Sequence, residues 1–583
     1  MSIILGINAY HSDSSACIIV NGKLIAAIEE ERIRRIKHWA GFPSKSIEYC
    51  LSEANIKLCD VDFVAINQSQ IANNWRRFSY LLRNKIDFNY VLNRLRHRHK
   101  RSNLSSEFKK VFPSDTFKGK FIQVEHHLAH MVSAHTVSPF KQSTVVSIDG
   151  FGDFASTAWG IGAGNKIDIN GRIYFPHSLG IFYMAMTQYL GFPNWGDEYK
   201  VMGLAPYGNL KYIKEVGSVI KLLDNGEFRL NLKFFSHYQD KNKIEWLGEE
   251  PKVLNLFTLD LEQLLGPARK KDDKLTQKHF DIARSVQFVY ETAFFNLLNK
   301  LYGRYGLKSL SLAGGCAMNS VANGKIIKKT PYTHIYVQAA SGDAGGAIGA
   351  AYYVYGKKNP GSNKYFEMDH AYWGPSYTNS YHKNLLDRNL SKIEKLFCSI
   401  EYINDENQLC DKVANAIAKG LVIGWFQGRM EWGPRALGNR SILGDPRREN
   451  MKDILNLKIK RRESFRPFAP SILLEKVYEW FENDVEVPFM SQVLQIREDK
   501  QKKVPAVTHV DGSGRLQTVS LKTNPLYYKL ISVFADKTGI PILLNTSFNE
   551  NEPIVCSPEE ALETFFRTKM DLLVLGNWIV KRK

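Results

Sequence analysis

The sequence predicts an α/β protein, and three observations support this fold class. Strand-like apolar runs alternate with helical patterns along the chain. Several of these runs end in glycine-rich turns. The composition, 44% apolar and 23% charged residues, is that of an ordinary globular protein, and the length of 583 residues suggests two to four domains.

The first elements are the clearest. Ile3–Asn8 reads as a strand, and Ala16–Val20 and Lys23–Ile28 read as two more, joined by Asn21-Gly22. An Asn-Gly pair between apolar runs predicts a β-hairpin. The other expected helices are 44–54 and 127–138, and the other expected strands are 61–66, 143–149, 309–313, 334–338, 420–426 and 542–545.

Charge and cysteine usage narrow the class of protein. Lys and Arg outnumber Asp and Glu by 78 to 59, and the net charge of +19 indicates anionic partners: phosphates, nucleic acid or anionic lipid. The seven cysteines are odd in number and contain no CxxC pair, so we expect reduced thiols and a cytoplasmic protein. No apolar run approaches the roughly 18 residues of a transmembrane helix.

Residues 72–110 differ from the rest, because Arg and Lys there alternate with aromatic residues and Leu. A solvated helical insertion would explain this composition. A patch that binds a membrane surface, a nucleic acid or an acidic partner would explain it as well. The sequence leaves both explanations open.

The first candidate site is the segment His126–His130. On a helix, His126 and His130 face the same way, so both imidazoles can reach one metal ion. A carboxylate would complete a site suited to iron, zinc or manganese, and Asp149 and Asp343 stand beside glycine at predicted strand ends. The histidine spacing alone is weak evidence, because such pairs more often cap, pack or face solvent.

The second candidate is a set of glycine turns after strands, at Asp149–Gly152, Gly314-Gly315 and Gly342–Gly346. Glycine lets backbone N–H groups approach phosphate oxygens. Three such turns in this order, after an N-terminal hairpin, are typical of the split ATP-binding cleft of actin-like proteins and sugar kinases. Walker and Rossmann motifs are absent.

The third candidate is a cationic segment, 428–440, that continues at 458–470. Arginine binds phosphate with two parallel hydrogen bonds, and Lys, Ser and Asn supply further donors. The charges stand among Gly, Pro, Trp and Phe, which favours an anion pocket over a solvated basic surface. Downstream polar residues that can join it are His509, Arg515, Asn545, Ser547 and Asn549.

Together these segments resemble the O-carbamoyltransferases of the nodulation-factor, tobramycin and cephamycin type, over nearly the whole chain. The matching motifs are Glu29–Arg32, Lys37-His38, Gly41–Pro43, His126–His130, Asp197–Ala205, Gly314–Asn319, Trp432–Arg440, Phe465–Pro470 and Asn545–Asn549.

The resemblance implies two domains and a two-step reaction. Residues 1–360 would form an actin-like (ASKHA) domain of two subdomains, with a basic insertion at about 72–110, and residues 367–583 a YrdC-like α/β domain, joined by a linker at 356–366. In the YrdC-like domain, carbamoyl phosphate would be cleaved and the carbamate joined to AMP from ATP, with release of pyrophosphate. In the actin-like domain, the carbamoyl-adenylate would give its carbamoyl group to an acceptor hydroxyl.

The same resemblance implies roles for individual residues. A ferrous iron, or another divalent metal, would be held by His126, His130, Asp149 and Asp343. The acceptor-side catalytic residues would be His11 and Asp13, in a segment one residue longer than in many relatives. The expected nucleotide contacts are Gly150, Gly314, Gly315, Asn319 and Gly345. The expected carbamoyl phosphate contacts are Arg435, Lys460, Arg466, Arg515, Asn545 and Ser547.

ATP and carbamoyl phosphate are the expected substrates, with Mg²⁺. The expected partner is a small molecule or glycan with a free hydroxyl, as in the biosynthesis of a natural product, antibiotic or toxin, and no nucleic acid is expected. The acceptor, the general base and the oligomeric state stay open. Two other functions also stay open: tRNA-directed (threonyl)carbamoyl transfer and a non-catalytic nucleotide-binding scaffold.

Overall fold

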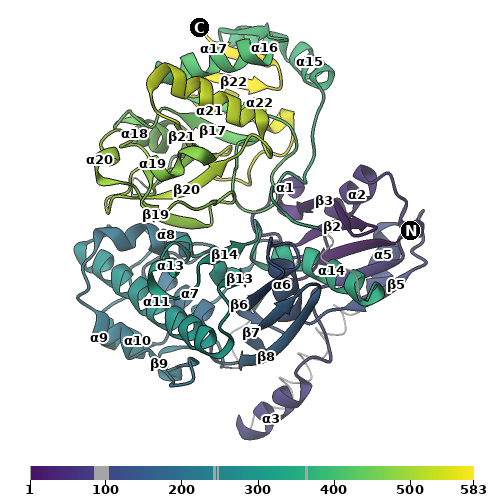
Figure 1. The fold of residues 1–583 in the computed structure, drawn as a ribbon, viewed down its shortest axis with the longest axis vertical. Helices are drawn as coiled ribbons and strands as arrows, with labels where there is room; N and C mark the ends of the chain where they lie inside the picture. Colours follow the sequence, from purple (N-terminus) through teal and green to yellow (C-terminus); the bar gives the residue numbers. More distant parts are fainter. Residues whose placement is uncertain (1, 85–103, 240–243, 246–248, 361–365, 464) are drawn as a thin grey trace. The chain divides into compact units, whose positions relative to one another are not determined.

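The computed structural model describes residues 2–84, 104–239, 244–245, 249–360, 366–463 and 465–583. The chain divides into two units (Figure 1). Unit 1 comprises Met1–Asn319 and Ile326–Met368, and unit 2 comprises Ser320–Lys325 and Asp369–Lys583. The sequence-based boundary, between residues 360 and 367, lies just before this division and leaves 320–325 in the first domain.

The first sheet of unit 1 has the strand order β3-β2-β1-β4-β5. Its strands are β1 (Ile3–Asn8), β2 (Ser15–Val20), β3 (Lys23–Glu29), β4 (Phe63–Ile66) and β5 (Lys120–Gln123). The pairs β1–β2 and β2–β3 are antiparallel, whereas β1–β4 and β4–β5 are parallel. Asn21 and Gly22 both have positive φ, 49° and 83°, as a type I′ turn requires, so the predicted hairpin is confirmed.

The second sheet repeats this pattern, with the order β14-β13-β6-β7-β8. Its strands are β6 (Gln142–Gly152), β7 (Ala155–Ala163), β8 (Lys166–Tyr174), β13 (Ser309–Ala313) and β14 (His334–Val337). Again three strands are antiparallel and two follow in parallel. The α/β class is therefore confirmed, and the duplicated sheet agrees with the expected pair of actin-like subdomains.

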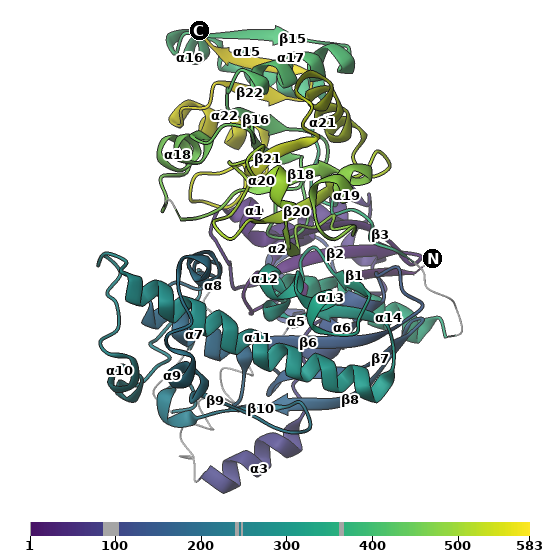
Figure 2. The ribbon, with the colours of Figure 1, turned by 60° about the vertical axis from the view of Figure 1, so that its left-hand side comes forward.

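Two helices lie between these sheets. α14 (Gly346–Lys358) packs on β1 and β4, and α6 (His126–His135) packs on β6, β13 and α14. α2 (Ser44–Glu53) covers β2 and β3, and α7 (Leu179–Tyr189) covers β6 (Figure 2). α14 continues through Lys358, so the predicted linker at 356–366 is wrong for its first three residues; Lys357 and Lys358 favour the helix C-terminus electrostatically. Residues 361–365 lie outside the described residues.

The remaining described elements of unit 1 are mostly short. The exception is α11 (Gln277–Tyr305), which contacts α7. The others are α1 (Glu30–Arg34), η1 (Leu58–Asp60), α3 (Asn74–Asn84), α5 (Leu104–Val111), α8 (Glu198–Leu204), η2 (Ala205–Tyr207), α9 (Ile213–Gly217), β9 (Ile220–Leu222), β10 (Phe228–Leu230), η3 (Leu232–Phe234), β11 (Ile244–Glu245), β12 (Lys252–Val253), α10 (Leu259–Leu265), η4 (Gly315–Met318), α13 (Ile326–Lys329) and η5 (Asp343–Gly345).

Unit 2 contains a nine-stranded mixed sheet, in the order β15-β23-β22-β16-β17-β21-β18-β20-β19. The strands are β15 (Cys398–Tyr402), β16 (Ile423–Phe426), β17 (Arg440–Gly444), β18 (Ala469–Leu473), β19 (Gln492–Gln495), β20 (Ser513–Val519), β21 (Ile542–Ser547), β22 (Leu572–Leu575) and β23 (Trp578–Arg582). The helices are α12 (Ser320–Asn323), α15 (Asn379–Arg388), α16 (Leu390–Lys395), α17 (Glu406–Ala418), α18 (Met451–Leu455), η6 (Asn456–Lys460), η7 (Leu474–Lys476), α19 (Val477–Trp480), α20 (Glu498–Gln501), α21 (Pro525–Thr538) and α22 (Pro558–Arg567). The YrdC likeness of this unit stays a prediction.

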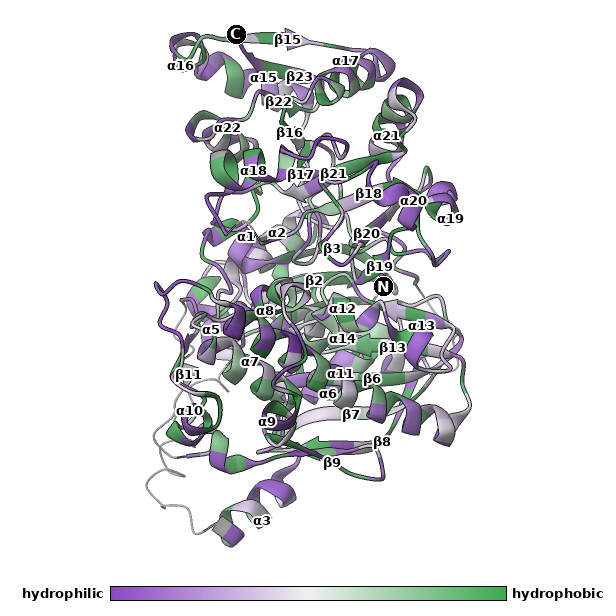
Figure 3. Ribbon diagram, turned by 90° about the vertical axis from the view of Figure 1, so that its left-hand side faces the viewer, coloured by the Kyte–Doolittle hydropathy of each residue, from purple (hydrophilic) through white to green (hydrophobic). Residues whose placement is uncertain are grey.

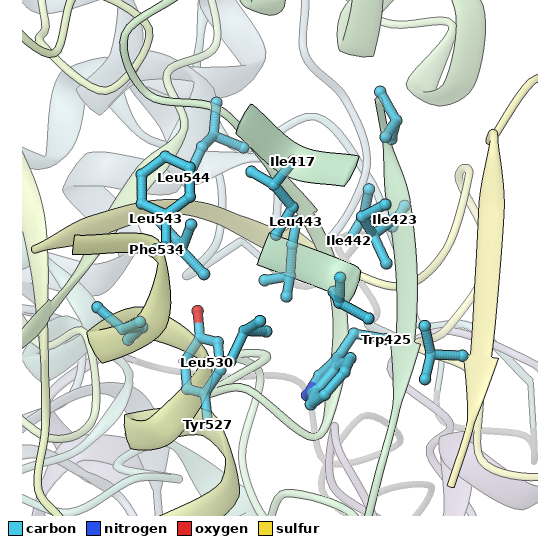
Figure 4. Close-up of a cluster of buried hydrophobic side chains, with 14 of the residues drawn as sticks. Ile417, Ile423, Trp425, Ile442, Leu443, Tyr527, Leu530, Phe534, Leu543 and Leu544 are labelled. Carbon is cyan, nitrogen blue, oxygen red and sulfur yellow. The ribbon is translucent and has the colours of Figure 1, made fainter. Parts of the chain in front are cut away.

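The core of unit 2 lies between this sheet and its helices. Trp425 and Leu443 on the sheet pack with Leu530 and Phe534 of α21, all fully buried (Figure 4). In both units the interior strands are mainly hydrophobic (Figure 3). Among the described residues no helix is long and apolar enough to span a bilayer. All seven cysteines fall within the described ranges and are free thiols.

Candidate functional site

The first site forms where neighbouring strands of unit 1 end. β6, β13 and β14 are parallel, so their carboxyl ends lie at one edge of the second sheet. Asp149 lies near the end of β6, Gly314 follows β13, and Asp343 opens the short helix after β14. The N-terminal half of α6 places His126 and His130 beside Asp149 and Asp343. Four sequence-predicted residues are thereby brought together from separate elements.

The four side chains form a tight cluster. The Nε2 atoms of His126 and His130 are 3.1 Å apart, and they lie 3.1 and 3.0 Å from Oδ2 of Asp149. Both Nε2 atoms are 3.5 Å from Oδ1 of Asp343. Both histidines are essentially buried, and one ligand atom from each of the four residues falls within 4.8 Å of the others.

The carboxylates dominate the electrostatics of the cluster. Burial alone would lower the pKa of His130, but hydrogen bonds to Asp149 and Asp343 and their charges raise it to about 9. Burial opposes the ionised form of Asp149 too, yet its hydrogen bonds to the histidines hold its pKa well below the usual range. A cation placed among these atoms therefore meets favourable charge.

A metal ion fits this set of residues. Two imidazole nitrogens and two carboxylate oxygens suit iron, zinc or manganese. Two Nε2 atoms and one carboxylate oxygen lie within 3.1 Å of one another, and only one hydrogen can stand between any two of them. A single cation would satisfy all three lone pairs at once. The third histidine, His127, faces elsewhere: its Nδ1 lies 2.9 Å from Ser147 Oγ.

Asp149 also organises the glycine turns. Its Oδ1 accepts hydrogen bonds from the backbone N–H of Gly150, at 2.8 Å, and of Gly315, at 3.1 Å. Gly314 has φ +85°, and a Cβ there would lie 2.2 Å from the carbonyl oxygen of Ile148. Only glycine fits such an approach. A Cβ on Gly150 would meet nothing within 4 Å, so this turn faces open space.

Two predicted nucleotide contacts have internal roles. Asn319 is buried, and its amide exchanges two hydrogen bonds, 3.1 and 3.2 Å long, with the amide of Gln287. Gly345 lies against the chain itself, since a Cβ there would be 2.2 Å from Ala340 O. Both residues shape the turns, and in this structure neither points its polar groups into open space.

The loop after β1 connects the metal cluster to a second group of side chains. The ring of His11 lies 5.2 Å from that of His126, and Ser12 Oγ donates a 2.8 Å hydrogen bond to Asp343 Oδ2. Asp13 turns the other way and pairs with His38, Oδ1 to Nδ1, at 2.8 Å. His11 is therefore beside the cluster, whereas Asp13 acts on His38.

The Asp13–His38 pair is held under backbone strain. Both residues have positive φ, 53° and 52°. Burial would lower the pKa of His38, but the charge of Asp13 and the hydrogen bond to it raise that pKa to about 9. Glu198 lies close enough to interact with this pair, and burial raises the pKa of its carboxyl to about 7. Sequence reasoning selected neither His38 nor Glu198 as a site residue, although both stand in the quoted motifs.

The second site lies in unit 2, around Arg515 on β20. β20, β18 and β21 are consecutive in the sheet, which places Arg515 near Asn545 and Ser547 of β21. Burial lowers the pKa of Arg515 well below its usual range, and the positive charges of Arg435, Arg462 and Arg466 lower it further. No described residue supplies a partner for Arg515 Nε.

Three guanidinium groups thus act on that of Arg515, and like charges gathered in this way favour the binding of an anion. The predicted residues Arg435, Arg466 and Arg515 belong to this group, which we call the guanidinium cluster, with Arg462 as its fourth member. Arg462 was missed as a site residue; its neighbours in the sequence, Lys460 and Arg461, gave no way to tell which cation points inward. Burial lowers the pKa of His509 to about 4, and the charge of Arg515 contributes to this lowering.

Three other predicted contacts support the loop architecture. Lys460 is buried, and its Nζ donates to Ser547 O and to Asn549 O and Oδ1, at 2.5, 2.8 and 2.7 Å. Asn545 is also buried and donates to Ala436 O, Ser471 Oγ and Gln517 Oε1. In this structure Lys460 therefore holds residues 547–549 in place, and Asn545 fixes the backbone next to Arg435 through its bond to Ala436.

The cationic segment 428–440 is mainly structural. Arg440 is fully buried, donates to carbonyl oxygens of Gly428 and Pro375, and lies 3.7 Å over the ring of Phe426. Glu431 Oε1 accepts from three backbone N–H groups, of residues 437, 439 and 440. Of the segment's arginines, Arg435 is the one whose charge bears on Arg515.

The cluster of His126, His130, Asp149 and Asp343 could hold a metal ion beside the glycine turns, and the guanidinium cluster is a separate group of positive charges. The chain belongs to the carbamoyltransferase family: the family model described as Carbamoyltransferase N-terminus matches residues 3–352, and Carbamoyltransferase C-terminus matches residues 414–582. The resemblance seen in the sequence is thereby confirmed, and the protein is an enzyme of the O-carbamoyltransferase family.

Its relatives include proteins with and without a described activity. An uncharacterised Synechocystis protein, sll1178, is 40% identical over 100% of this chain and 97% of its own. The nodulation protein NolNO of Sinorhizobium fredii is 39% identical over 99% of this chain and 80% of its own. The 3′-hydroxymethylcephem-O-carbamoyltransferase of Streptomyces clavuligerus is 34% identical over 42% of each chain.

Proposed function

We propose that the protein is an ATP-dependent O-carbamoyltransferase that forms carbamoyl-adenylate from carbamoyl phosphate and ATP and passes the carbamoyl group to a hydroxyl of a natural product or glycan. The observation that carries the proposal is the guanidinium cluster of unit 2, since three like charges around Arg515 favour a compact polyanion as the ligand. The membership of the carbamoyltransferase family supports the choice of carbamoyl phosphate.

The first steps use the guanidinium cluster. Arg435, Arg462, Arg466 and Arg515 bind the phosphate group of carbamoyl phosphate, and water cleaves this substrate to carbamate and inorganic phosphate. A carbamate oxygen then attacks the α-phosphorus of ATP, and pyrophosphate leaves. Lys460 and Asn545 keep the loops beside the cluster in place through the hydrogen bonds described above. The arginines supply charge stabilisation, which is worth most where water is excluded.

The last step belongs to unit 1. The acceptor hydroxyl attacks the carbonyl carbon of the adenylate, AMP leaves, and a base takes the hydroxyl proton. We propose His11 as this base, because its ring lies beside the metal cluster. Asp13 and His38 position the loop, since their side chains are paired with each other. A metal held by His126, His130, Asp149 and Asp343 would supply positive charge to the adenylate phosphate.

The backbone N–H groups of the glycine turns complement this charge. Gly150 faces open space, so its turn can approach a phosphate oxygen closely.

The proposal is tested by pyrophosphate release. The purified protein should release pyrophosphate from ATP when carbamoyl phosphate is present and should not do so when it is omitted. Mass spectrometry on a panel of hydroxylated acceptors should then find one carbamoyl group added. If no pyrophosphate is released when ATP and carbamoyl phosphate are both present, or if its release does not depend on carbamoyl phosphate, the proposed chemistry is wrong.

A further inference from the structure

The helix α3 (Asn74–Asn84) has two unlike faces, and neither belongs to the sites described above. It lies at the edge of unit 1 in two different views (Figures 1 and 2). At about 100° per residue, Trp75, Phe78 and Leu82 fall within roughly 60° of one another on the helix. They form an outer face, and the residues that hold the helix to the protein lie opposite.

The inner face is firmly attached. The ring of Tyr80 contacts Phe154 and Phe175 edge-on, with centroids 5.8 and 5.2 Å apart. The guanidinium of Arg76 lies 4.9 Å over the ring of Tyr174, and Arg77 pairs with Asp153 at 3.7 Å. The orientation of the helix is therefore fixed, and its outer face points away from the protein.

The outer face exposes large apolar side chains to an unusual extent. Trp75 is 76% exposed, Phe78 53% and Leu82 66%, and Ile71, just before the helix, is 78% exposed. Single exposed apolar residues are ordinary, but the three on α3 are at helical spacing and form one apolar stripe, with Ile71 just before it. Such a stripe is costly in water unless something covers it.

The charge of α3 indicates the kind of surface that covers it. The helix contains Arg76, Arg77 and Arg83 and no acidic residue. Arg76 and Arg83 are exposed and, at about 80–100° from Trp75, lie along one border between the stripe and the inner face; the guanidinium of Arg76 reaches from there over Tyr174. The sequence that continues from the helix, residues 85–101, adds six more Lys and Arg and a single Asp. A partner therefore has to offer an apolar layer beside negative charge.

We propose that α3 docks the protein onto the surface of an anionic lipid bilayer, with Trp75, Phe78 and Leu82 inserted at the level of the headgroups. An amphipathic helix with aromatic and Leu residues on one face and arginines on its flank is the arrangement that lies in a membrane interface. A nucleic acid would contact cations at the centre of the face, and here the centre is apolar. The metal cluster and the guanidinium cluster are not involved.

Vesicle flotation tests the proposal. The protein should float with mixed phosphatidylcholine–phosphatidylglycerol vesicles, should stay unbound with phosphatidylcholine alone, and should be released by raising the salt concentration. The triple variant Trp75→Ser, Phe78→Ser, Leu82→Ser should lower the vesicle partition coefficient by at least about 100-fold, because it removes the inserted apolar surface.

A matched variant controls for apolar surface in general. Leu259, Phe397 and Leu521 are 73%, 76% and 60% exposed and lie outside α3. Changing these three to Ser should alter the partition coefficient less than about twofold. Circular dichroism and the melting temperature of both triple variants should match the parent protein, because no substituted side chain is buried.

Four results would overturn the proposal. One is an absence of binding to anionic vesicles, or equal binding to neutral ones. Another is a triple variant of α3 that still binds like the parent. The third is a lower melting temperature of that variant with unchanged vesicle binding, which would mean that the stripe is covered within the chain. Binding of RNA that depends on Trp75, without binding of vesicles, would likewise replace the bilayer with a nucleic acid.

Discussion

Replacing Arg515 by Met should make the anion-free protein more stable and, at the same time, destroy its use of carbamoyl phosphate. Arg515 is partly buried among Arg435, Arg462 and Arg466, and its pKa is well below the usual range because of burial and these charges. Met keeps the length and apolar character of the stem and removes the charge. The charges that bind the anion are thus expected to destabilise the protein when no anion is bound.

The size of the effect follows from the like charges. Two unit charges about 8 Å apart at an effective dielectric constant of 20 repel with about 2 kcal/mol. Salt and partial exposure reduce the sum of three such terms to about 1–2 kcal/mol. For a unit of this size, that raises the melting temperature by about 2–8 °C. An anion at a concentration 100 times its dissociation constant stabilises the native protein by about 2.7 kcal/mol. The variant should lose most of this stabilisation.

The assay is a thermal melt of both proteins with and without inorganic phosphate, accompanied by pyrophosphate release from ATP and carbamoyl phosphate. The order of the two melting temperatures should reverse: that of the variant is higher without phosphate, and that of the parent is higher with phosphate. Arg388→Met, at an exposed arginine of α15, is the control and should change neither melt. A variant that melts lower without phosphate, or that gains as much from phosphate as the parent, would refute the electrostatic reasoning.

Three further predictions concern unit 1. His130→Ala should remove half of the imidazole pair and abolish stoichiometric metal binding, which elemental analysis of the purified protein measures; unchanged metal content would rule out this site. His11→Asn should slow transfer from supplied carbamoyl-adenylate by at least about 100-fold while pyrophosphate release persists, and unimpaired transfer would remove His11 from the mechanism. The His38–Asp13 pair should stabilise the fold below about pH 6.5 and lose this effect as the pH rises through the folded-state pKa of about 9. The melting temperature of the parent should therefore exceed that of His38→Gln at pH 6, by the equivalent of about 1 kcal/mol, and match it near pH 10; a constant difference would contradict this.

The sequence predicted the secondary structure of unit 1 well because its strongest signals are local. The strands Ile3–Asn8 and Ser309–Ala313 have the expected ends, and Asn21-Gly22 forms the expected turn. α6 was expected at 127–138 and spans His126–His135. Helix ends depend on capping groups, here Glu125, which accepts from the N–H of Leu128, and periodicity does not reveal them.

From the sequence alone, we could not tell which polar side chains of unit 2 are available for a ligand and which form contacts within the protein. Lys460 and Arg440 stand in cationic motifs as Arg435 does, yet the structure gives Lys460 four oxygen contacts and stacks Arg440 on Phe426. Whether a cationic side chain holds a loop in place or binds an anion depends on which carbonyl groups the sheet brings near it. That information comes from long-range strand pairing, such as Ala469 with Asn545, and one sequence does not contain it in readable form.

Asp149 explains why the metal cluster and the glycine turns occur together in one site. Its two oxygens have different partners: Oδ2 lies 3.0 Å from His130 Nε2, and Oδ1 accepts from the N–H groups of Gly150 and Gly315. A residue that only bound metal would not need the second set, and a residue that only shaped the turns would not need the histidines. Because one carboxylate has both sets of partners, a cation held by the cluster would lie beside the turn N–H groups before any substrate arrives. Such preorganisation is what stabilises charge on a phosphate without rearrangement during the reaction. It follows that Asp149→Asn, which keeps the acceptor Oδ1 and removes the charge, should separate the two roles: the turns should keep their geometry while metal binding weakens.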